Sequence, residues 1–230
     1  MRPRGSGWAI MLTALLFTPV TGWAQSRPPE ARTLPATILI FLLPDVMLFP
    51  HSTRALHIFE PRYRAMVADA LDGDRLIGMV LLRSGYEADY EGRPPVYSIG
   101  CAGRITNVEQ LPDGRYAIVL QGLVKFRVTS EDDSRPYRLA HVEAIPELLD
   151  DEERVALRDK RRQLTGLLAS IAPGSELPPP GLPDEDLVNG LAQFLDIQPR
   201  DRQELLERNG PLERAQALID LLQMPKVPPR

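Results

Sequence analysis

The amino-acid sequence predicts an α+β protein in which the strands come first, with one helix among them, and a group of helices comes last. Apolar and polar residues alternate between Tyr116 and Thr129, as in a strand with one buried face. Between residues 63 and 71, apolar residues recur instead at the spacing of one helix face. From Asp150 onward, only the helical spacing is found. The two parts cover residues 36–147 and 148–224, and residues 225–230 form a tail.

The first 24 residues contain the three parts of a secretory signal peptide in their usual order. Two arginines lie within the first four residues, the uncharged apolar run Trp8–Val20 follows, and small residues precede the expected cleavage between Ala24 and Gln25. The run is shorter than the roughly 20 apolar residues of a membrane span, so we expect no membrane anchor after cleavage. The signal predicts a periplasmic protein with a flexible leader at 25–35. If the start codon is misassigned, the protein is cytoplasmic instead.

The first strands and the helix after them follow from short patterns. Thr37–Leu43 is a continuous apolar run of strand length, closed by a turn at Pro44. A second short strand passes through His57 and ends just before Pro61, which suits the first turn of a helix because no hydrogen bond is lost there. Gly73 ends this helix. Its buried stripe consists of Tyr63, Met66, Val67, Ala70 and Leu71.

The remaining strands surround one clear hairpin. Arg75–Arg83 is predicted as a buried strand and Arg138–Ile145 as the last strand. Between them, Tyr97–Leu111 and Tyr116–Thr129 form a hairpin joined by the turn Pro112-Asp113-Gly114. Each arm contains a glycine that is predicted to mark a bulge or a barrel corner. These glycines are Gly103 and Gly122.

Four helices are predicted after Asp150. The second is expected to be capped by Asp184, and the third and fourth begin at Pro199 and Pro211. Their apolar stripes predict a bundle. The inward residues are Leu164, Leu167, Leu168 and Ile171 in the first helix, Leu187, Leu191, Phe194 and Leu195 in the second, and Leu212, Ala215, Ile219 and Leu222 in the fourth.

Several segments together closely resemble the LON substrate-binding domain, the amino-terminal domain of Lon proteases. They read LFP…HIFEPRYRAMV, DRLIGMVLL, IGCAGRITNVEQLPDGRYAIVLQGLVKFRV and QELLERNGPLERAQALIDLL, and the likeness runs from about Leu34 to Leu222. The resemblance implies a PUA-like β pseudo-barrel with one inserted helix, followed by a helical bundle. His51 departs from the family, which usually carries glycine after the Phe-Pro pair, so we expect a changed turn there.

The chemistry of a complete Lon protease is not expected in this chain. A Lon-type ATPase needs a phosphate-binding G-x-x-x-x-G-K-[ST] loop, and none of the three lysines follows such a pattern. The serine–lysine peptidase belongs to a separate domain. The spacing of His51, His57 and His141 does not suit a metal site, and His57 and Glu60 span a strand–helix junction. We therefore expect no catalytic residues, no cofactor and no metal.

The charge argues against nucleic acid as a partner. The chain has 27 basic and 31 acidic residues, and removal of the two signal arginines leaves 25 basic residues. An acidic protein lacks the cationic surface that nucleic acids and anionic lipids usually require.

The single cysteine cannot close an internal disulfide. Cys101 shares one strand face with Tyr97, Ile99 and Ile105, which predicts a core residue. The alternative is a reactive thiol, which needs a nearby cation or a helix amino terminus.

The sequence offers one candidate surface for peptide contact. Tyr86 and Tyr90 lie in a polar loop rich in glycine and proline, and the turn Leu48-Phe49-Pro50 is apolar. Exposed aromatics beside polar loop residues suit adaptable peptide binding, whereas the alternative is that both tyrosines cover the end of the barrel.

A second group of residues, Glu60, Pro61, Arg62 and Tyr63, is predicted to be structural and to orient the helix on the barrel. The alternative is that Glu60, Arg62 and Arg64 recognise a carboxylate or a peptide backbone. Asp132, Asp133 and the acidic cluster 147–153 are expected in solvated turns and at a helix start.

These observations predict a non-catalytic LON-domain module that binds peptides or unfolded polypeptide segments. A small-ligand or RNA-binding PUA-like barrel is one alternative, and an adaptor of a complete Lon-type protease is another if the chain stays in the cytosol. A hydrolase in the cleft between barrel and bundle is a third. The oligomeric state is left open.

The export prediction can be checked by mass spectrometry of the amino terminus after cell fractionation. We expect the protein in the periplasmic fraction to begin at Gln25, because signal peptidase cleaves after small residues such as Ala24. Full-length protein beginning at Met1 in the cytosol would contradict the prediction.

Overall fold

The computed structural model describes residues 33–171, 178–179 and 181–224. The signal segment with its cleavage position at Ala24 and Gln25, and the tail after residue 224, lie outside these residues.

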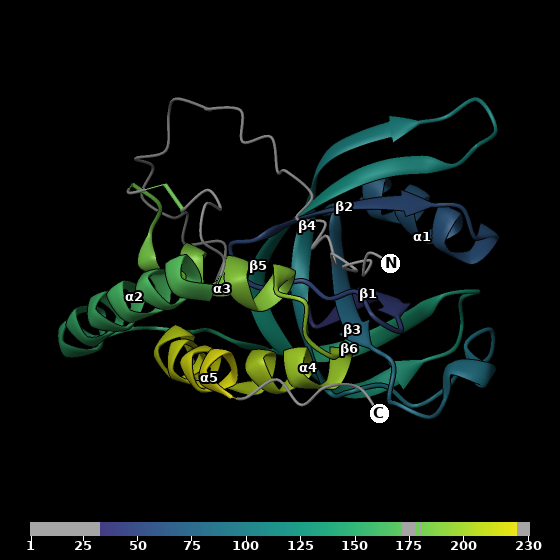
Figure 1. The fold of residues 1–230 in the computed structure, drawn as a ribbon. Coiled ribbons are helices and arrows are strands. Elements are labelled where there is room, and N and C mark those ends of the chain that lie inside the picture. Colours follow the sequence, from purple (N-terminus) through teal and green to yellow (C-terminus); the bar gives the residue numbers. More distant parts are fainter. Residues whose placement is uncertain (1–32, 172–177, 180, 225–230) are drawn as a thin grey trace, which may run out of the picture.

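One mixed sheet of six strands forms the first part of the fold. The strand order is β2-β5-β4-β3-β1-β6, and an additional pairing of β5 with β6 closes five of the strands into a ring (Figure 1). Strand β1 runs parallel to β3, and the other neighbours are antiparallel. Among the strands of the described residues, β2 alone stays outside the ring, at an edge. The strands are β1 (Thr37–Leu43), β2 (Thr53–Ile58), β3 (Leu76–Leu81), β4 (Ile99–Gln110), β5 (Tyr116–Asp132) and β6 (Arg138–Ile145).

The long strand β5 pairs with three neighbours because it bends at a bulge. Ala102 pairs with Val124 but Gly103 pairs with Gly122, which leaves one extra residue on β5. A Cβ on Gly122 would clash with the carbonyl oxygen of Phe49. The backbone at Phe49 can therefore pass close to β5 here only because residue 122 has no side chain. The prediction of a bulge at the two glycines is confirmed.

The interior of the ring is filled by apolar side chains. Phe126 is fully buried, and a Cβ on Gly100 would lie 2.7 Å from its ring atom Cζ, so this glycine leaves the space that the ring needs. Burial of such a side chain contributes about 2 kcal/mol. The interior residues are Ile38, Ile40, Leu42, Val80, Leu82, Ala102, Val124, Phe126 and Ala140.

Figure 1 shows the helices α2 to α5 together at one side of the sheet and α1 at the other side. A second, larger core is continuous from the outer face of the ring into these helices. The predicted α+β class, with a pseudo-barrel followed by a helical bundle, is confirmed. The helices are α1 (Pro61–Asp72), α2 (Asp151–Ile171), α3 (Asp184–Phe194), α4 (Pro199–Glu207) and α5 (Pro211–Gln223), and η2 (Glu87–Asp89) is a single 3₁₀ turn.

Helix ends differ from the prediction in two respects. Asp184 is the first residue of α3 and not its cap, a position that Pro183 occupies, and the Asp184 carboxylate pairs with Arg161 at 2.9 Å. Ile171 and Phe194 were expected to point inward but are exposed. Each is the last residue of its helix. At this position the apolar stripe of the helix extends beyond the neighbouring elements that bury its earlier turns.

Cys101 lies in the core of β4, and the prediction of a structural cysteine is confirmed. Burial raises the pKa of its thiol well above the usual value, and the nearby Glu147 carboxylate acts in the same direction. The thiol therefore stays protonated and unreactive at neutral pH.

A buried cluster of three charged side chains joins the ring of strands to the helices. Lys125 lies on β5, Glu147 follows β6 and Arg214 lies on α5. Their exposed side-chain fractions are 2%, 8% and 0%. The carboxylate oxygen Oε1 of Glu147 is 2.9 Å from Nζ of Lys125 and 2.5 Å from Nη2 of Arg214. Glu147 was expected in a solvated turn, so this prediction is wrong.

Arg214 uses its remaining donors on two other helices. Its Nε donates to the carbonyl oxygen of Leu205 on α4 at 3.0 Å, and its Nη1 donates to the side chain of Asn189 on α3. Its guanidinium also stacks over the ring of Phe49 at 5.4 Å. A charge without water must be paired and hydrogen-bonded, and this arrangement meets that demand with groups from several elements.

The stability should depend on the ionised form of Glu147. Burial disfavours that form, but Arg214 and Lys125 outweigh burial and hold the pKa of the carboxyl below its ordinary value of 4.5. Because the folded pKa is the lower one, this contribution is complete above pH 4.5 and is lost as the pH falls through the folded pKa. Glu147→Gln should lower the free energy of unfolding at pH 7 by about 3 kcal/mol, and urea titration measures it.

The control for this variant is Glu204→Gln, which removes an exposed carboxylate that pairs with Arg200 on the surface of α4. We expect a change within about 0.5 kcal/mol for the control. The gap between the wild-type protein and Glu147→Gln should narrow as the pH is lowered from 4.5. A gap that is small at pH 7, or that does not change with pH, would contradict the role given to Glu147.

Candidate functional site

The turn Leu48-Phe49-Pro50, predicted to contact peptides, is buried in the structure. Gln193 of α3 covers it and holds both of its ends. The Gln193 oxygen accepts a hydrogen bond from the backbone N–H of Phe49 at 2.9 Å, and its amide nitrogen donates to the carbonyl oxygen of Thr53 at 2.8 Å. The structure thus corrects the prediction that this turn offers its side chains to a ligand: they belong to the joint between sheet and helices.

His51 follows this turn and adopts a left-handed backbone, with a φ of 62°. This is the region that glycine favours, and histidine enters it more readily than most residues. Its N–H donates to the carbonyl oxygen of Gly122 at 2.9 Å, and its ring nitrogen Nδ1 lies 3.2 Å from a carboxylate oxygen of Asp186. The His51 side chain is thus accommodated in a backbone conformation that glycine favours, and the expected difference of this turn from the family stays a prediction.

The two predicted tyrosines have different surroundings. Tyr86 is 42% exposed in the loop before η2. Tyr90 is half-buried, and its hydroxyl donates to Oε1 of Glu60 at 2.9 Å and lies 3.3 Å from the carbonyl oxygen of Leu42. Burial raises the pKa of Tyr90 far above its ordinary value. Tyr90 therefore covers the end of the ring, and within the predicted contact set Tyr86 is the residue whose side chain faces solvent.

The residues Glu60, Pro61, Arg62 and Tyr63 connect β2 to α1 and to the loop of Tyr90. The Glu60 carboxylate pairs with Arg62 Nε at 3.0 Å, and Pro61 is the first residue of α1. The guanidinium of Arg62 lies over the rings of Tyr63 and Tyr90, at 4.7 and 4.8 Å from their centroids. These contacts engage the charged groups of Glu60 and Arg62 at the junction of β2, α1 and the loop of Tyr90.

The histidines do not form a common site. His51 precedes β2, His57 lies within it, and His141 of β6 hydrogen-bonds to Thr37. Within the described residues, no group of three or more His, Cys, Asp or Glu side chains is arranged to hold a metal ion. None of the helices described by the structure combines the length and the apolar character of a membrane span.

Strand β2 is the edge of the sheet, and among the described residues it pairs with β5 alone. The carbonyl oxygen of Ser52 accepts from the N–H of Gly122 in β5, whereas that of Thr53 accepts from Gln193 on the opposite side. Since peptide groups alternate in direction along an antiparallel strand, those of Ala55 and His57 also point away from β5. Ala55 and His57 are both exposed. The strand thus offers a row of backbone donors and acceptors at an open edge.

Exposed aromatic rings lie at both ends of this edge. Phe59 follows the last residue of β2 and is 62% exposed. Phe194, at the end of α3, is 49% exposed and lies under the guanidinium of Arg54 in β2, at 4.9 Å. Apolar side chains beside an unpaired strand edge are typical of a surface that accepts another chain. Sequence reasoning missed this surface, because Phe194 has the spacing of a core residue and β2 contains no unusual motif.

Comparisons with known proteins agree with the fold and identify the family of the chain. The family model of the ATP-dependent protease La (LON) substrate-binding domain matches residues 37–224. Lon protease 2 of Sorangium cellulosum is 34% identical over 153 residues, which is 62% of this chain and 19% of that protein. Lon protease 2 of Myxococcus xanthus is 26% identical over 231 residues, which is 96% of this chain and 26% of that protein.

Two solved structures have the same fold. The Lon N-terminal domain protein from Xanthomonas campestris matches with a TM-score of 0.56 and 24% identity, over 82% of this chain and 99% of that one. The N-terminal domain of the Mycobacterium avium complex Lon protease matches with a TM-score of 0.59 and 17% identity, over 81% and 97% of the two chains. The matched region spans about a fifth to a quarter of the two Lon proteases above. The chain belongs to the LON substrate-binding domain family.

Proposed function

We propose that this protein binds extended or unfolded polypeptide segments along the open edge of β2, without chemistry of its own. The family match supports a substrate-binding role, and the unpaired edge is the observation that carries the proposal. An edge strand accepts any extended backbone through main-chain hydrogen bonds, while nearby side-chain contacts select among sequences. This mode suits a domain that must hold many different substrates.

The dimensions and chemistry of the edge fit such a segment. Strand β2 has six residues, which corresponds to about 20 Å of extended chain. Phe59 and Phe194 at its two ends provide apolar contacts for side chains that are buried in a folded substrate and exposed in an unfolded one.

The edge can be tested with Ala55→Pro. Proline removes an N–H that points away from β5, so the substitution blocks an added strand while the pairing of β2 with β5 is kept. We expect affinity for a fluorescently labelled, permanently unfolded protein to fall about five-fold or more, since a hydrogen bond is lost and the ring obstructs the edge. Fluorescence anisotropy measures the affinity.

Ala55→Val is the matched control, because it keeps the N–H and favours the strand. Its affinity should equal that of the wild-type protein. If the proline and valine variants bind with equal affinity, the binding site does not lie along the edge of β2. Absence of binding of any unfolded polypeptide by the wild-type protein, with a folded protein as background, would contradict the proposed function itself.

A further inference from the structure

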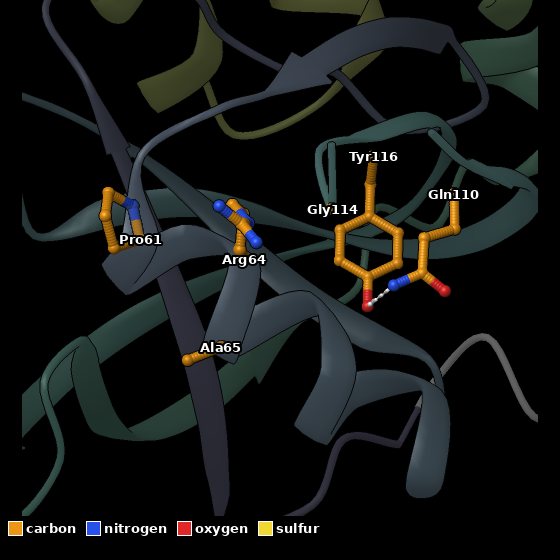
Figure 2. Close-up of a pocket in the computed structure, with 6 residues that line it drawn as sticks. All are labelled: Pro61, Arg64, Ala65, Gln110, Gly114 and Tyr116. Carbon is orange, nitrogen blue, oxygen red and sulfur yellow. Dashed lines mark hydrogen bonds between the residues drawn. The ribbon is translucent and has the colours of Figure 1, made fainter. Parts of the chain in front are cut away.

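A shallow pocket lies between the first turn of α1 and the end of the β4–β5 hairpin. Its volume is about 340 Å³, and Figure 2 shows the side chains that form its walls. They are Pro61, Arg64 and Ala65 of α1 and Gln110, Gly114 and Tyr116 of the hairpin.

Arg64 gives this pocket a positive charge that is not part of an ion pair with any described residue. Within the described part of the chain, the Arg64 guanidinium makes no hydrogen bond and no ion pair. It lies against Gly114, whose φ of 81° is in the left-handed region and where a Cβ would clash with Nη2 of Arg64. The hairpin turn therefore positions the guanidinium by packing and leaves its N–H donors available.

The turn contains one carboxylate, which is already engaged. Asp113 accepts hydrogen bonds from the backbone N–H of Arg115 at 3.1 Å and from its Nε at 2.7 Å. The backbone hydrogen bond from Arg115 is the main reason that the pKa of Asp113 lies below its ordinary value, and Arg64 contributes less. Asp113 and Arg115 form a pair of their own, so the charge of Arg64 faces the pocket.

Tyr116 adds a second donor to the same pocket. Gln110 Nε2 donates to the hydroxyl oxygen of Tyr116 at 3.2 Å (Figure 2). The hydroxyl hydrogen is then free to be donated to a ligand. The pocket thus combines a guanidinium fork with a neutral O–H donor, a combination that recognises carboxylates and phosphates. Of these two groups, an unmodified polypeptide carries the carboxylate.

We propose that the pocket binds a carboxylate of a captured polypeptide, either its carboxyl terminus or an acidic side chain. The inference rests on the proposed polypeptide-binding function and adds a chemical preference to it. Two N–H groups of Arg64 pair with the two carboxylate oxygens, and Tyr116 donates a third hydrogen bond. Arg64 is only half-buried, so water competes, and the preference amounts to about three- to ten-fold in affinity.

The test uses one short, unstructured apolar peptide in three forms: with a free carboxyl terminus, with an amidated terminus, and amidated with one internal glutamate. Fluorescence anisotropy gives the affinity of each form for the wild-type protein, Arg64→Gln and Arg104→Gln. Arg104 is an exposed arginine of β4 outside the pocket, so its variant matches the loss of charge. We expect one of the two carboxylate forms to bind about three- to ten-fold more tightly than the neutral form. Arg64→Gln should abolish this preference and Arg104→Gln should keep it.

The form that gains affinity identifies the source of the carboxylate. If the wild-type protein binds all three forms with equal affinity, the pocket assignment is overturned and polypeptide binding is left intact. A preference for a carboxylate form that survives Arg64→Gln has the same meaning. If no peptide binds, the proposed function fails, and the pocket is then tested with acetate alone by NMR. Shifts of the Gln110 and Gly114 amides that vanish in Arg64→Gln support a carboxylate site, and unchanged amides overturn it.

Discussion

The fully buried guanidinium of Arg214 is the constraint on which the rest of this structure depends. A charge at this depth must be paired, and Glu147, Asn189 and the backbone of Leu205 supply its partners from three different segments. Lys125 of β5 shares the same carboxylate. The position of the helices relative to the ring of strands is therefore determined by hydrogen-bond geometry as well as by apolar packing, which alone is tolerant of small shifts.

The edge of β2, which we propose as the binding surface, depends on this joint. Arg214 stacks on Phe49, and Gln193 holds the same turn from α3, so the chain that leads into β2 is fixed at its start. The Glu60–Arg62 pair fixes the chain where β2 passes into α1. An edge held at both ends loses little freedom when a partner strand is added, which reduces the cost of binding. Passive capture of polypeptides, as proposed, requires such an edge and no source of energy.

The sequence predicts this fold well where the pattern is local, and poorly where a contact joins distant segments. The hairpin, the bulge glycines and the stripe of α1 follow from periodicity and turn chemistry, and the structure agrees. Lys125, Glu147 and Arg214 are polar residues in amphipathic or acidic segments, so their type predicts solvent exposure, and only the tertiary fold brings them together. The same reasoning misplaced the Leu48-Phe49-Pro50 turn, because an apolar turn is equally consistent with a contact surface and with cover by α3. The edge of β2 was missed because edge position is a property of the sheet.

Native-state hydrogen exchange in increasing denaturant tests the central claim most directly, since it measures whether the strands and helices open together. If the Arg214 cluster joins them into one cooperative unit, the slowest amides of β5 and of α5 should exchange with the same free energy, equal to that of global unfolding. Amides of α3, α4 and α5 that exchange through a separate opening of lower free energy, while β5 stays protected, would contradict this account.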